Sequence, residues 1–313
     1  MKTYAFGADI GGTTVKIGLF KTSGELLEVW EIPTETRENG AYILSDIAEE
    51  IEKKIEQRKI LREDIEGIGM GVPGPVSPEG VVLKCVNLGW DIFNVEIEMT
   101  RLTGLKAKAG NDANVAALGE MWQGGGQGYQ DIVMVTLGTG VGGGIIINGR
   151  IVPGTCGAAG EIGHIPIRDN ETECCGCGKK GCLEQYASAN GIVRMMKKYL
   201  EENPDAKSTL RGRKTYTSKE IFEEALNKDK AALLMIDEVG RLLGKALASI
   251  SCVVDPQAFV IGGGMSKAGD ILIDAIQRHY EKYAFHASKN MAFRLAKLGN
   301  SAGIYGAVKQ ILD

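Results

Sequence analysis

One pattern occurs twice in this chain: a buried strand, a turn rich in glycine and threonine, and a second strand. The first copy runs from residues 4–10 through Gly11, Gly12, Thr13 and Thr14 into an alternating apolar strand. The second copy runs from residues 131–137 through the glycine-rich residues 138–144 to the apolar residues 145–147. Backbone N–H groups and small hydroxyls in such turns suit phosphate oxygens. The duplication therefore predicts two similar domains that face one nucleotide.

Two better-known nucleotide motifs do not fit these turns. Neither turn is a Walker-type loop, because no Gly-Lys-Ser/Thr sequence opens a helix. Neither is a dinucleotide-binding fingerprint, because strands rather than helices follow the glycines. A Gly-Gly turn alone also occurs in a plain β-hairpin, so the second copy is what favours nucleotide binding.

Strands alternate with helices along the rest of the chain, which predicts the α/β class. Isoleucines four residues apart from Ile43 to Ile55 predict a surface helix with one buried stripe. Further predicted elements are strands at 65–71, 105–109, 258–261 and 295–298, and helices at 94–103, 113–122, 185–202, 217–252 with a break near Lys228, 270–285 and 302–312. Thr217 and Glu220 have the spacing of a capping box.

A cluster of cysteines follows the second turn. Cys175, Cys177 and Cys182, with the nearby His164, supply the four thiolate and imidazole ligands of a tetrahedral zinc site, and Cys174 is spare. A disulfide knot would suit a short secreted chain, whereas this one has 313 residues and no signal-like N-terminal segment. Four protein ligands leave no open position, so the predicted role is structural. We interpret Cys85, Cys156 and Cys252 as buried small residues.

Carboxylates stand at both ends of this cluster and at the end of a predicted strand. Glu161 and Glu184 flank the cysteines, and Asp112 follows the strand 105–109. Asp112 has two interpretations, a cap of the next helix or a base that takes a proton from an attacking hydroxyl. We favour the base, and the two roles are geometrically compatible.

Composition limits the partners. The net charge of −4 and a pI of about 5.6 argue against nucleic acid or an anionic membrane surface. No apolar run approaches the length that spans a membrane. Free thiols beside a metal cluster suit a reducing cytoplasm, where we expect the protein to be.

Five segments together resemble the ROK family of sugar kinases and repressors. They are DIGGTTVKIGLF at 9–20, GNDAN at 110–114, TLGTGVGGG at 136–144, GEIGH at 160–164 and CGCGKKGCLE at 175–184. The resemblance covers essentially the whole chain, keeps the family's motif order, and is closest to its bacterial glucokinases. It implies an actin-like, ribonuclease H-like ATPase fold of two α/β domains with a central cleft. The implied domains are 1–112 with 299–313, and 113–298 with the zinc-binding loop.

The resemblance also implies an activity, ATP-dependent phosphorylation of glucose at its 6-hydroxyl, which would make the chain a transferase of glycolysis. Asp112 would be the catalytic base. Substrate would be held by Gly74, Asn87, Asn111, Asp112, Glu161, His164 and Glu184. Nucleotide and Mg²⁺ would be held by Asp9, Gly11, Gly12, Thr13, Thr14, Lys16, Gly138, Thr139, Gly140, Gly262, Gly263 and Gly264. Lys16 could equally be an outward strand lysine. Zinc would be held by His164, Cys175, Cys177 and Cys182.

Several alternatives stay open. The substrate could be another hexose or N-acetylhexosamine, such as fructose, allose, N-acetylmannosamine or N-acetylglucosamine. A sugar-sensing transcriptional regulator of the same family would carry a helix-turn-helix before the first hairpin, for which Asp9 leaves no room. Polyphosphate as donor would want a basic groove, and none is evident. The family expectation for assembly is a homodimer.

Overall fold

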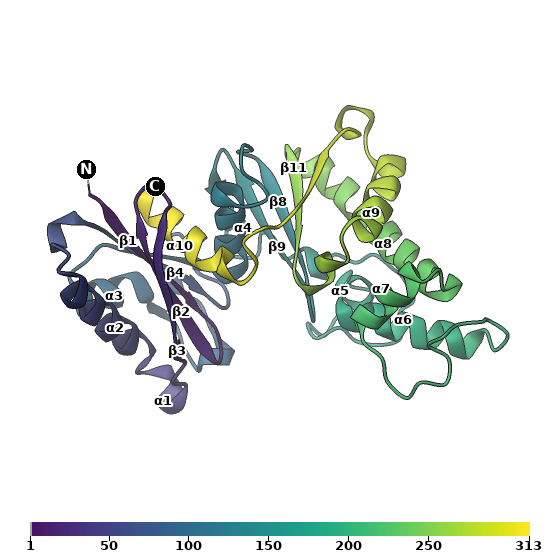
Figure 1. Cartoon of the computed structure of the whole chain (residues 1–313), viewed down its shortest axis with the longest axis horizontal. Coiled ribbons are helices and arrows are strands. Elements are labelled where there is room, and N and C mark those ends of the chain that lie inside the picture. Colours follow the sequence, from purple (N-terminus) through teal and green to yellow (C-terminus); the bar gives the residue numbers. More distant parts are fainter. Residues whose placement is uncertain (1) are drawn as a thin grey trace. The chain divides into compact units, whose positions relative to one another are not determined.

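The computed structural model describes residues 2–313, and its strands form two five-stranded sheets and one short two-stranded sheet (Figure 1). By contacts the chain divides into two compact units. Unit 1 comprises residues 1–130, 144–160 and 297–313, and unit 2 comprises residues 131–143 and 161–296. The domains expected from the sequence, 1–112 with 299–313 and 113–298, remain a prediction.

The first sheet has the strand order β3-β2-β1-β4-β7. β2 is antiparallel to both β1 and β3, whereas β4 is parallel to β1 and to β7. The bounds are β1 Tyr4–Ile10, β2 Thr14–Lys21, β3 Leu26–Pro33, β4 Ile65–Val72 and β7 Ala107–Asn111. The two-stranded sheet pairs β5 Val81–Val82 with β6 Phe93–Asn94.

The second sheet repeats this plan in the order β10-β9-β8-β11-β12. β9 and β10 are antiparallel, and β11 is parallel to both β8 and β12. The bounds are β8 Ile132–Leu137, β9 Val141–Ile147, β10 Arg150–Ile151, β11 Ala258–Gly262 and β12 Ala292–Leu295. The predicted duplication of strand, turn and strand is therefore a duplication of a whole sheet.

Both faces of the first sheet are covered. On one face, Phe6, Ala8 and Ile10 of β1 share a core with the isoleucine stripe of α2 Ile43–Arg58, and with Val95 and Met99 of α3 Val95–Thr103. Ala5 and Phe20 belong to a second core with Ile304, Val308 and Ile311 of α10 Ala302–Leu312. Successive side chains of β1 thus enter different cores, as strand geometry requires. The short helix α1 Arg37–Gly40 precedes α2.

Glycines let α10 lie unusually close to its neighbours. A Cβ at Gly69 of β4 would lie 1.7 Å from the carbonyl oxygen of Ala307. A Cβ at Gly306 would lie 1.6 Å from the carbonyl oxygen of Val115 in α4 Asp112–Gln123. Side chains at these positions would push the backbones apart, so part of the high glycine content serves helix packing.

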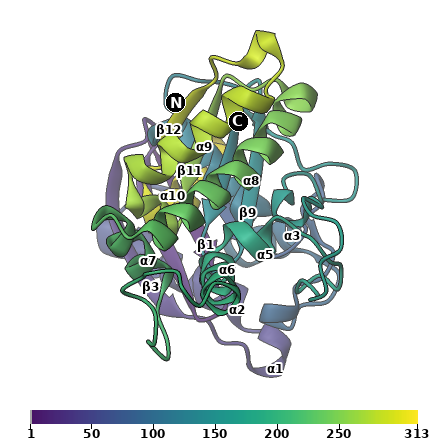
Figure 2. The ribbon, with the colours of Figure 1, turned by 90° about the vertical axis from the view of Figure 1, so that its right-hand side faces the viewer.

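Unit 2 carries the remaining helices, α5 Glu184–Ala187, α6 Ala189–Glu202, α7 Ser218–Leu226, α8 Lys230–Val254 and α9 Asp270–Tyr283. The long helix α8 lies beside α9, as Figures 1 and 2 show. Phe259 of β11, Tyr280 of α9 and Phe293 of β12 pack ring against ring, with centroids 5.3–5.6 Å apart. These rings hold α9 on the second sheet.

Several sequence predictions are wrong in detail. The strand expected at 295–298 is β12 Ala292–Leu295, where four residues pair in register with β11. The glycines 142–144 lie inside β9 rather than in a turn. The helix expected at 185–202 breaks at Ser188, whose side chain accepts from the Gly191 N–H and begins α6. Cys156 and Cys252 are exposed, and only Cys85 of the three is buried.

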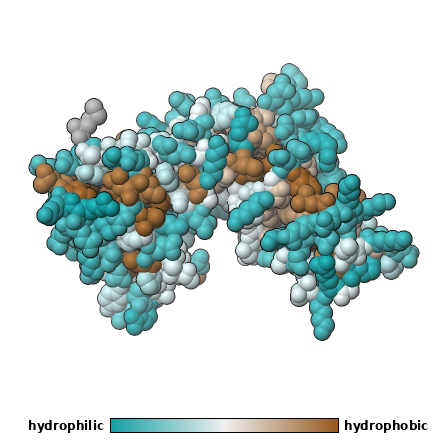
Figure 3. Space-filling view, in the orientation of Figure 1, coloured by the Kyte–Doolittle hydropathy of each residue, from teal (hydrophilic) through white to brown (hydrophobic). Residues whose placement is uncertain are grey.

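No helix of the described residues is long and apolar enough to cross a bilayer. The face in Figure 3 is predominantly hydrophilic, with apolar residues gathered in separate smaller areas.

Candidate active site

The start of α4 brings together three of the predicted substrate residues. Asn111, the last residue of β7, accepts hydrogen bonds through Oδ1 from the N–H groups of Ala113 (3.1 Å) and Asn114 (3.2 Å). Its Nδ2 donates to the carbonyl oxygen of Gly74 (3.1 Å) and to Oδ1 of Asp112 (3.0 Å). The interpretation of Asp112 as the cap is therefore wrong: Asn111 caps the helix, and Asp112 is its first residue. These capping hydrogen bonds fix the side chain of Asn111. The carboxylate of Asp112 lies in the first turn of α4, where the helix dipole stabilises a negative charge.

A second carboxylate lies near Asp112 in the same unit. Asp9 is the penultimate residue of β1 and pairs with Gly71 of β4, where a Cβ would lie 3.3 Å from Oδ1 of Asp9 and 3.7 Å from the Cα of Asp112. Burial, and then the negative charge of Asp112, raise the pKa of Asp9 from 3.8 to about 6, although Lys16 opposes this. Two carboxylates that disfavour each other's charge fit a divalent cation, and Mg²⁺ is commonly bound through one or two such groups and water.

The first hairpin turn is open at its tip. Thr13 and Thr14 are exposed. The hydroxyl of Thr34 donates to the carbonyl oxygen of Gly11 (2.7 Å) and so fixes the base of the turn. Lys16 forms an ion pair with Glu31 (3.2 Å) and donates to the carbonyl oxygen of Asn300 (3.1 Å). These contacts favour the alternative interpretation of Lys16 as a strand lysine.

Asn87 is exposed and lies in the one-turn 3₁₀ helix Val86–Leu88, which follows Cys85 and whose Leu88 is buried. Gly74 packs against this segment, since a Cβ there would lie 2.9 Å from the carbonyl oxygen of Lys84. Asn87 is thus close along the chain to the residues that contact Gly74.

In unit 2 the predicted metal ligands converge. The Sγ atoms of Cys175, Cys177 and Cys182 and a ring nitrogen of His164 all lie within 4.8 Å of one another. The Cys177 and Cys182 sulfurs are 3.7 Å apart, and Cys175 Sγ is 3.8 Å from Nδ1 of His164. In a tetrahedral site with Zn–S bonds of about 2.3 Å, two sulfurs lie about 3.8 Å apart. The four residues therefore fit zinc.

The pKa of one of the cysteine thiols also favours a bound cation. Burial and the neighbouring thiols raise the pKa of the Cys182 thiol to about 12 when no cation is present. A cluster of three thiolates needs a cation to compensate its charge, and a soft divalent ion supplies it. Cys174 is exposed and outside the cluster.

The metal cluster touches the second hairpin through Glu184. One carboxylate oxygen of Glu184 accepts from the N–H of Val141 (3.0 Å), and the other lies 3.5 Å from Cys175 Sγ. Gly140 leaves room for this carboxylate, because a Cβ there would lie 2.2 Å from it. His164 turns Nδ1 toward the thiols, while its Nε2 lies 3.9 Å from a carboxylate oxygen of Glu161. Glu161, His164 and Glu184 are thus joined through the cluster.

The predicted nucleotide glycines of unit 2 also lie next to one another. Gly263 has a positive φ of 83°, and a Cβ there would lie 2.5 Å from the carbonyl oxygen of Leu137, directly before Gly138. The N–H of Ala189 at the start of α6 donates to the carbonyl oxygen of Gly138 (2.8 Å). Gly262, Gly263 and Gly264 therefore adjoin the turn Gly138, Thr139 and Gly140, whose threonine is exposed.

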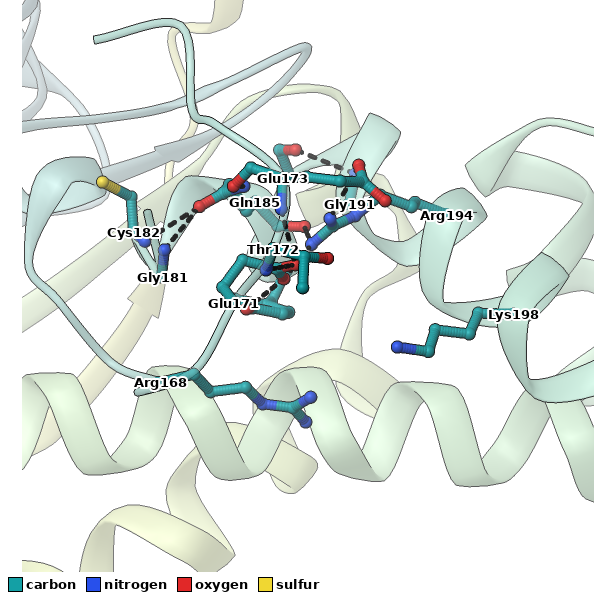
Figure 4. A network of polar contacts seen from close by, with 12 residues as sticks. Arg168, Glu171, Thr172, Glu173, Gly181, Cys182, Gln185, Gly191, Arg194 and Lys198 are labelled. Carbon is teal, nitrogen blue, oxygen red and sulfur yellow. Dashed lines mark hydrogen bonds and ion pairs between the residues drawn. The ribbon is translucent and has the colours of Figure 1, made fainter. Parts of the chain in front are cut away.

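Sequence reasoning missed Gln185, whose side-chain amide connects the two ends of the loop 173–182 that carries the cysteine ligands. The side-chain oxygen of Gln185 accepts from the N–H groups of Gly181 (2.8 Å) and Cys182 (3.1 Å), and its Nε2 donates to the carbonyl oxygen of Glu173 (3.0 Å) (Figure 4). Arg194 pairs with Glu171 and Glu173, both at 3.0 Å. One amide therefore joins the two ends of the loop without any metal. Its partners are backbone groups, so no residue pattern could have indicated it.

A second omission is Glu120, which is fully buried in α4. Its carboxylate accepts from the N–H groups of Gly125 (2.7 Å), Lys297 (2.9 and 3.1 Å) and Leu298 (2.7 Å). Lys297 is the first residue of the segment that returns to unit 1. A buried acidic residue in an apolar helix pattern was the available signal, because such a group needs partners.

The repeated sheet order, the two glycine turns and the carboxylates at the strand ends define the class, a two-unit α/β protein of the actin-like, ribonuclease H-like type. The ROK family model matches residues 5–313, and the chain belongs to the ROK family.

The glucokinase of Halalkalibacterium halodurans is 42% identical over 304 residues, covering 96% of this chain and 92% of the relative. An N-acetyl-D-glucosamine kinase of Mannheimia succiniciproducens is 29% identical over 320 residues, covering 98% and 99%. The crystal structure of a ROK family glucokinase from Streptomyces griseus in complex with glucose and AMPPNP superimposes with a TM-score of 0.73 at 33% identity, covering 98% of each chain. These similarities confirm the predicted fold and family.

Proposed function

We propose that the protein is an ATP-dependent glucokinase that transfers the γ-phosphoryl group to the 6-hydroxyl of glucose. This proposal rests on the start of α4. There the side chain of Asn111 caps the helix by accepting from Ala113 N–H, and its Nδ2 donates to Oδ1 of Asp112. A positioned carboxylate can serve as the base in phosphoryl transfer, and the 42% identical glucokinase supports glucose as the acceptor.

In this proposal Asp112 accepts the proton of the 6-hydroxyl as that oxygen attacks the γ-phosphorus and ADP leaves. Both N–H groups of Asn111 already donate, to Gly74 and to Asp112, so Asn111 would donate to the sugar in exchange for its hydrogen bond to the Gly74 carbonyl, which would then accept from a sugar hydroxyl. Asn87, Glu161, His164 and Glu184 complete the sugar-binding set. A neutral polyol suits such a set because adjacent hydroxyls both donate and accept.

Different residues would bind the nucleotide, Mg²⁺ and zinc. The turns 11–14 and 138–140 would bind phosphates through backbone N–H groups and hydroxyls, and Gly262, Gly263 and Gly264 would flank the adenosine. Asp9 would orient Mg²⁺, which supplies charge neutralisation on the phosphates. His164, Cys175, Cys177 and Cys182 would hold a structural zinc ion that keeps His164 and Glu184 in place. The homodimer, the cytoplasmic location and the absence of nucleic-acid partners stay predictions.

The test is a coupled phosphorylation assay across hexoses and N-acetylhexosamines with ATP, and with polyphosphate as a second donor. We expect the highest kcat/KM for glucose with ATP. A preference for N-acetylglucosamine, the substrate named for the Mannheimia relative, would instead support the alternative ROK kinase.

The variant Asp112→Asn tests the base. Removing a general base typically costs about 10²–10⁴ in rate, so kcat should fall by at least about 100-fold. Glucose binding, measured by calorimetry, should persist because the amide keeps the shape and the Asn111 contact. Near-normal turnover would refute the role of Asp112.

A further inference from the structure

A cavity of about 290 Å³ lies in unit 1 beside β7, the edge strand of the first sheet. Its walls come from Lys108–Asn111 at the end of β7, residues 76–78 after β4, Glu96 of α3, the first two turns of α4, β10 with the loop after it, and the C-terminal turn of α10. Asn111 is the one residue of the proposed catalytic and binding set on these walls. Its volume is at the lower end of the range for small-molecule sites, roughly 300–1,000 Å³.

Two side-chain amides in this wall have unused acceptors. Asn114 is 4% exposed, and its Oδ1 is buried without a hydrogen-bond partner. Oε1 of Gln310 in α10 is likewise buried and unpartnered, against the backbone of Gly110. Only four buried side-chain polar atoms of residues 2–313 lack a partner, and two of them belong to this cavity. Both oxygens are covered, so each would gain a hydrogen bond only when its side chain turns toward the cavity and accepts from a donor there.

The charges around the cavity leave one cation unpaired. Lys108 pairs with Glu96 (3.3 Å), whose other oxygen accepts from the Ala109 N–H (2.9 Å). The carboxylate of Asp313 pairs with Lys309. Arg150 of β10 lines the cavity and is exposed, and its guanidinium makes no hydrogen bond or ion pair with any described residue.

We propose that this cavity is an effector site for a hydroxylated organic anion of monosaccharide size, such as a sugar phosphate or a sugar acid. The anionic group binds Arg150, because a guanidinium pairs with phosphate or carboxylate through two N–H groups. Hydroxyl groups donate to Asn114 and Gln310 once these side chains turn toward the cavity. The aliphatic side chains of Val76, Leu118, Ile151 and Pro153 cover the C–H face of the ligand.

Such a ligand would contact the helix that begins with Asp112 and the loop that leads from β10 toward Glu161. Its binding should therefore change turnover. The binding itself is independent of the proposed function, whereas the kinetic effect rests on it.

The test is calorimetry on the full chain with glucose at saturation, so that the proposed sugar site is occupied. The probes are glucose 6-phosphate, gluconate and inorganic phosphate. We expect one equivalent of the phosphate ester or the sugar acid to bind with millimolar or tighter affinity, and the stronger of the two identifies the anionic group. Inorganic phosphate alone should bind at least tenfold more weakly, because it lacks the carbon-bound hydroxyls.

Two variants locate the site. Arg150→Ala should weaken binding at least tenfold, whereas Lys219→Ala, which removes an exposed cation on α7, should leave it unchanged. Gln310→Met should also weaken binding, yet its thermal midpoint should equal or exceed that of the parent, since a buried acceptor without a partner is removed. In the same conditions the bound probe should change kcat/KM of the parent at least twofold and of Arg150→Ala much less.

Four results would overturn the proposal. The first is no saturable binding of either organic probe up to about 10 mM, tenfold above the expected millimolar limit. The others are binding unchanged in both variants, inorganic phosphate binding as well as glucose 6-phosphate, or a lower thermal midpoint for Gln310→Met, which would give its oxygen a structural role. Binding without any kinetic effect, in an enzyme that phosphorylates glucose, would overturn the effector role. Failure of the proposed function itself would appear separately, as an absence of phosphorylation in the hexose screen.

Discussion

Replacing Glu120 should destabilise unit 1 out of proportion to the size of the change. The Glu120 carboxylate is fully buried and accepts hydrogen bonds from three backbone N–H groups, those of Gly125, Lys297 and Leu298. In Glu120→Gln, the new NH₂ group must face one of these donors, and the surviving hydrogen bonds lose their charge. A hydrogen bond to a charged group contributes about 1.5–3 kcal/mol, so we expect a loss of about 2–3 kcal/mol.

Glu120→Ala should cost more, about 3–5 kcal/mol, because all three N–H groups then lack the carboxylate. The assay is chemical denaturation of each variant beside the parent, followed by far-UV circular dichroism. At roughly 2–4 °C per kcal/mol for a body of this size, Glu120→Gln should lower the thermal midpoint by roughly 5–10 °C.

The matched control is Glu223→Gln on α7, where an exposed glutamate pairs only with Lys219. Surface changes of this kind usually stay within about 0.5 kcal/mol. A loss below about 0.5 kcal/mol for Glu120→Gln would refute the reasoning, because it would mean that water can replace the carboxylate at the return of the chain to unit 1.

Three further outcomes follow from the site. Burial and Asp112 raise the folded pKa of Asp9 to about 6, above the unfolded 3.8, so the folded state binds the extra proton between these pH values and stability falls as pH rises from about 4 to 6. Asp9→Asn should abolish this slope and be more stable at pH 7 by up to about 3 kcal/mol, and equal pH profiles in denaturation would contradict it. Cys177→Ser should lose the metal found by atomic absorption and Cys174→Ser should keep it, while a parent protein purified without metal would exclude the zinc site. Gln185→Leu should release zinc to a chelator at least several-fold faster than Gln277→Leu, a control on α9 whose partly exposed amide donates to Glu281. Equal release rates would show that the Gln185 amide does not hold the loop.

Local sequence patterns predicted the elements whose signals lie within one stretch of chain. The isoleucine stripe of α2, the capping box at Thr217 and Glu220, and the closing helix α10 are present as expected. Predictions of element bounds failed where pairing with a strand distant in the sequence determines them. β12 ends at Leu295 because its register with β11 begins at Ala292, and the glycines 142–144 continue β9 because that strand pairs within the second sheet. Asn111 rather than Asp112 is the cap because α4 begins at Asp112, one residue earlier than predicted, and the side chain of Asn111 accepts from the N–H groups of Ala113 and Asn114.

The metal ligands were readable from the sequence because three of them lie within eight consecutive residues, and thiolate and imidazole ligands at such spacing have few other uses. The duplicated hairpins were readable for the same reason, since each copy is continuous in the chain. Only the tertiary structure decided that Asp9 lies beside Asp112, that Gln185 joins both ends of the metal loop, and that Glu120 holds the segment at Lys297. These contacts join residues through buried charges and backbone groups, and no periodicity in a sequence records which backbone N–H a folded carboxylate or amide will meet.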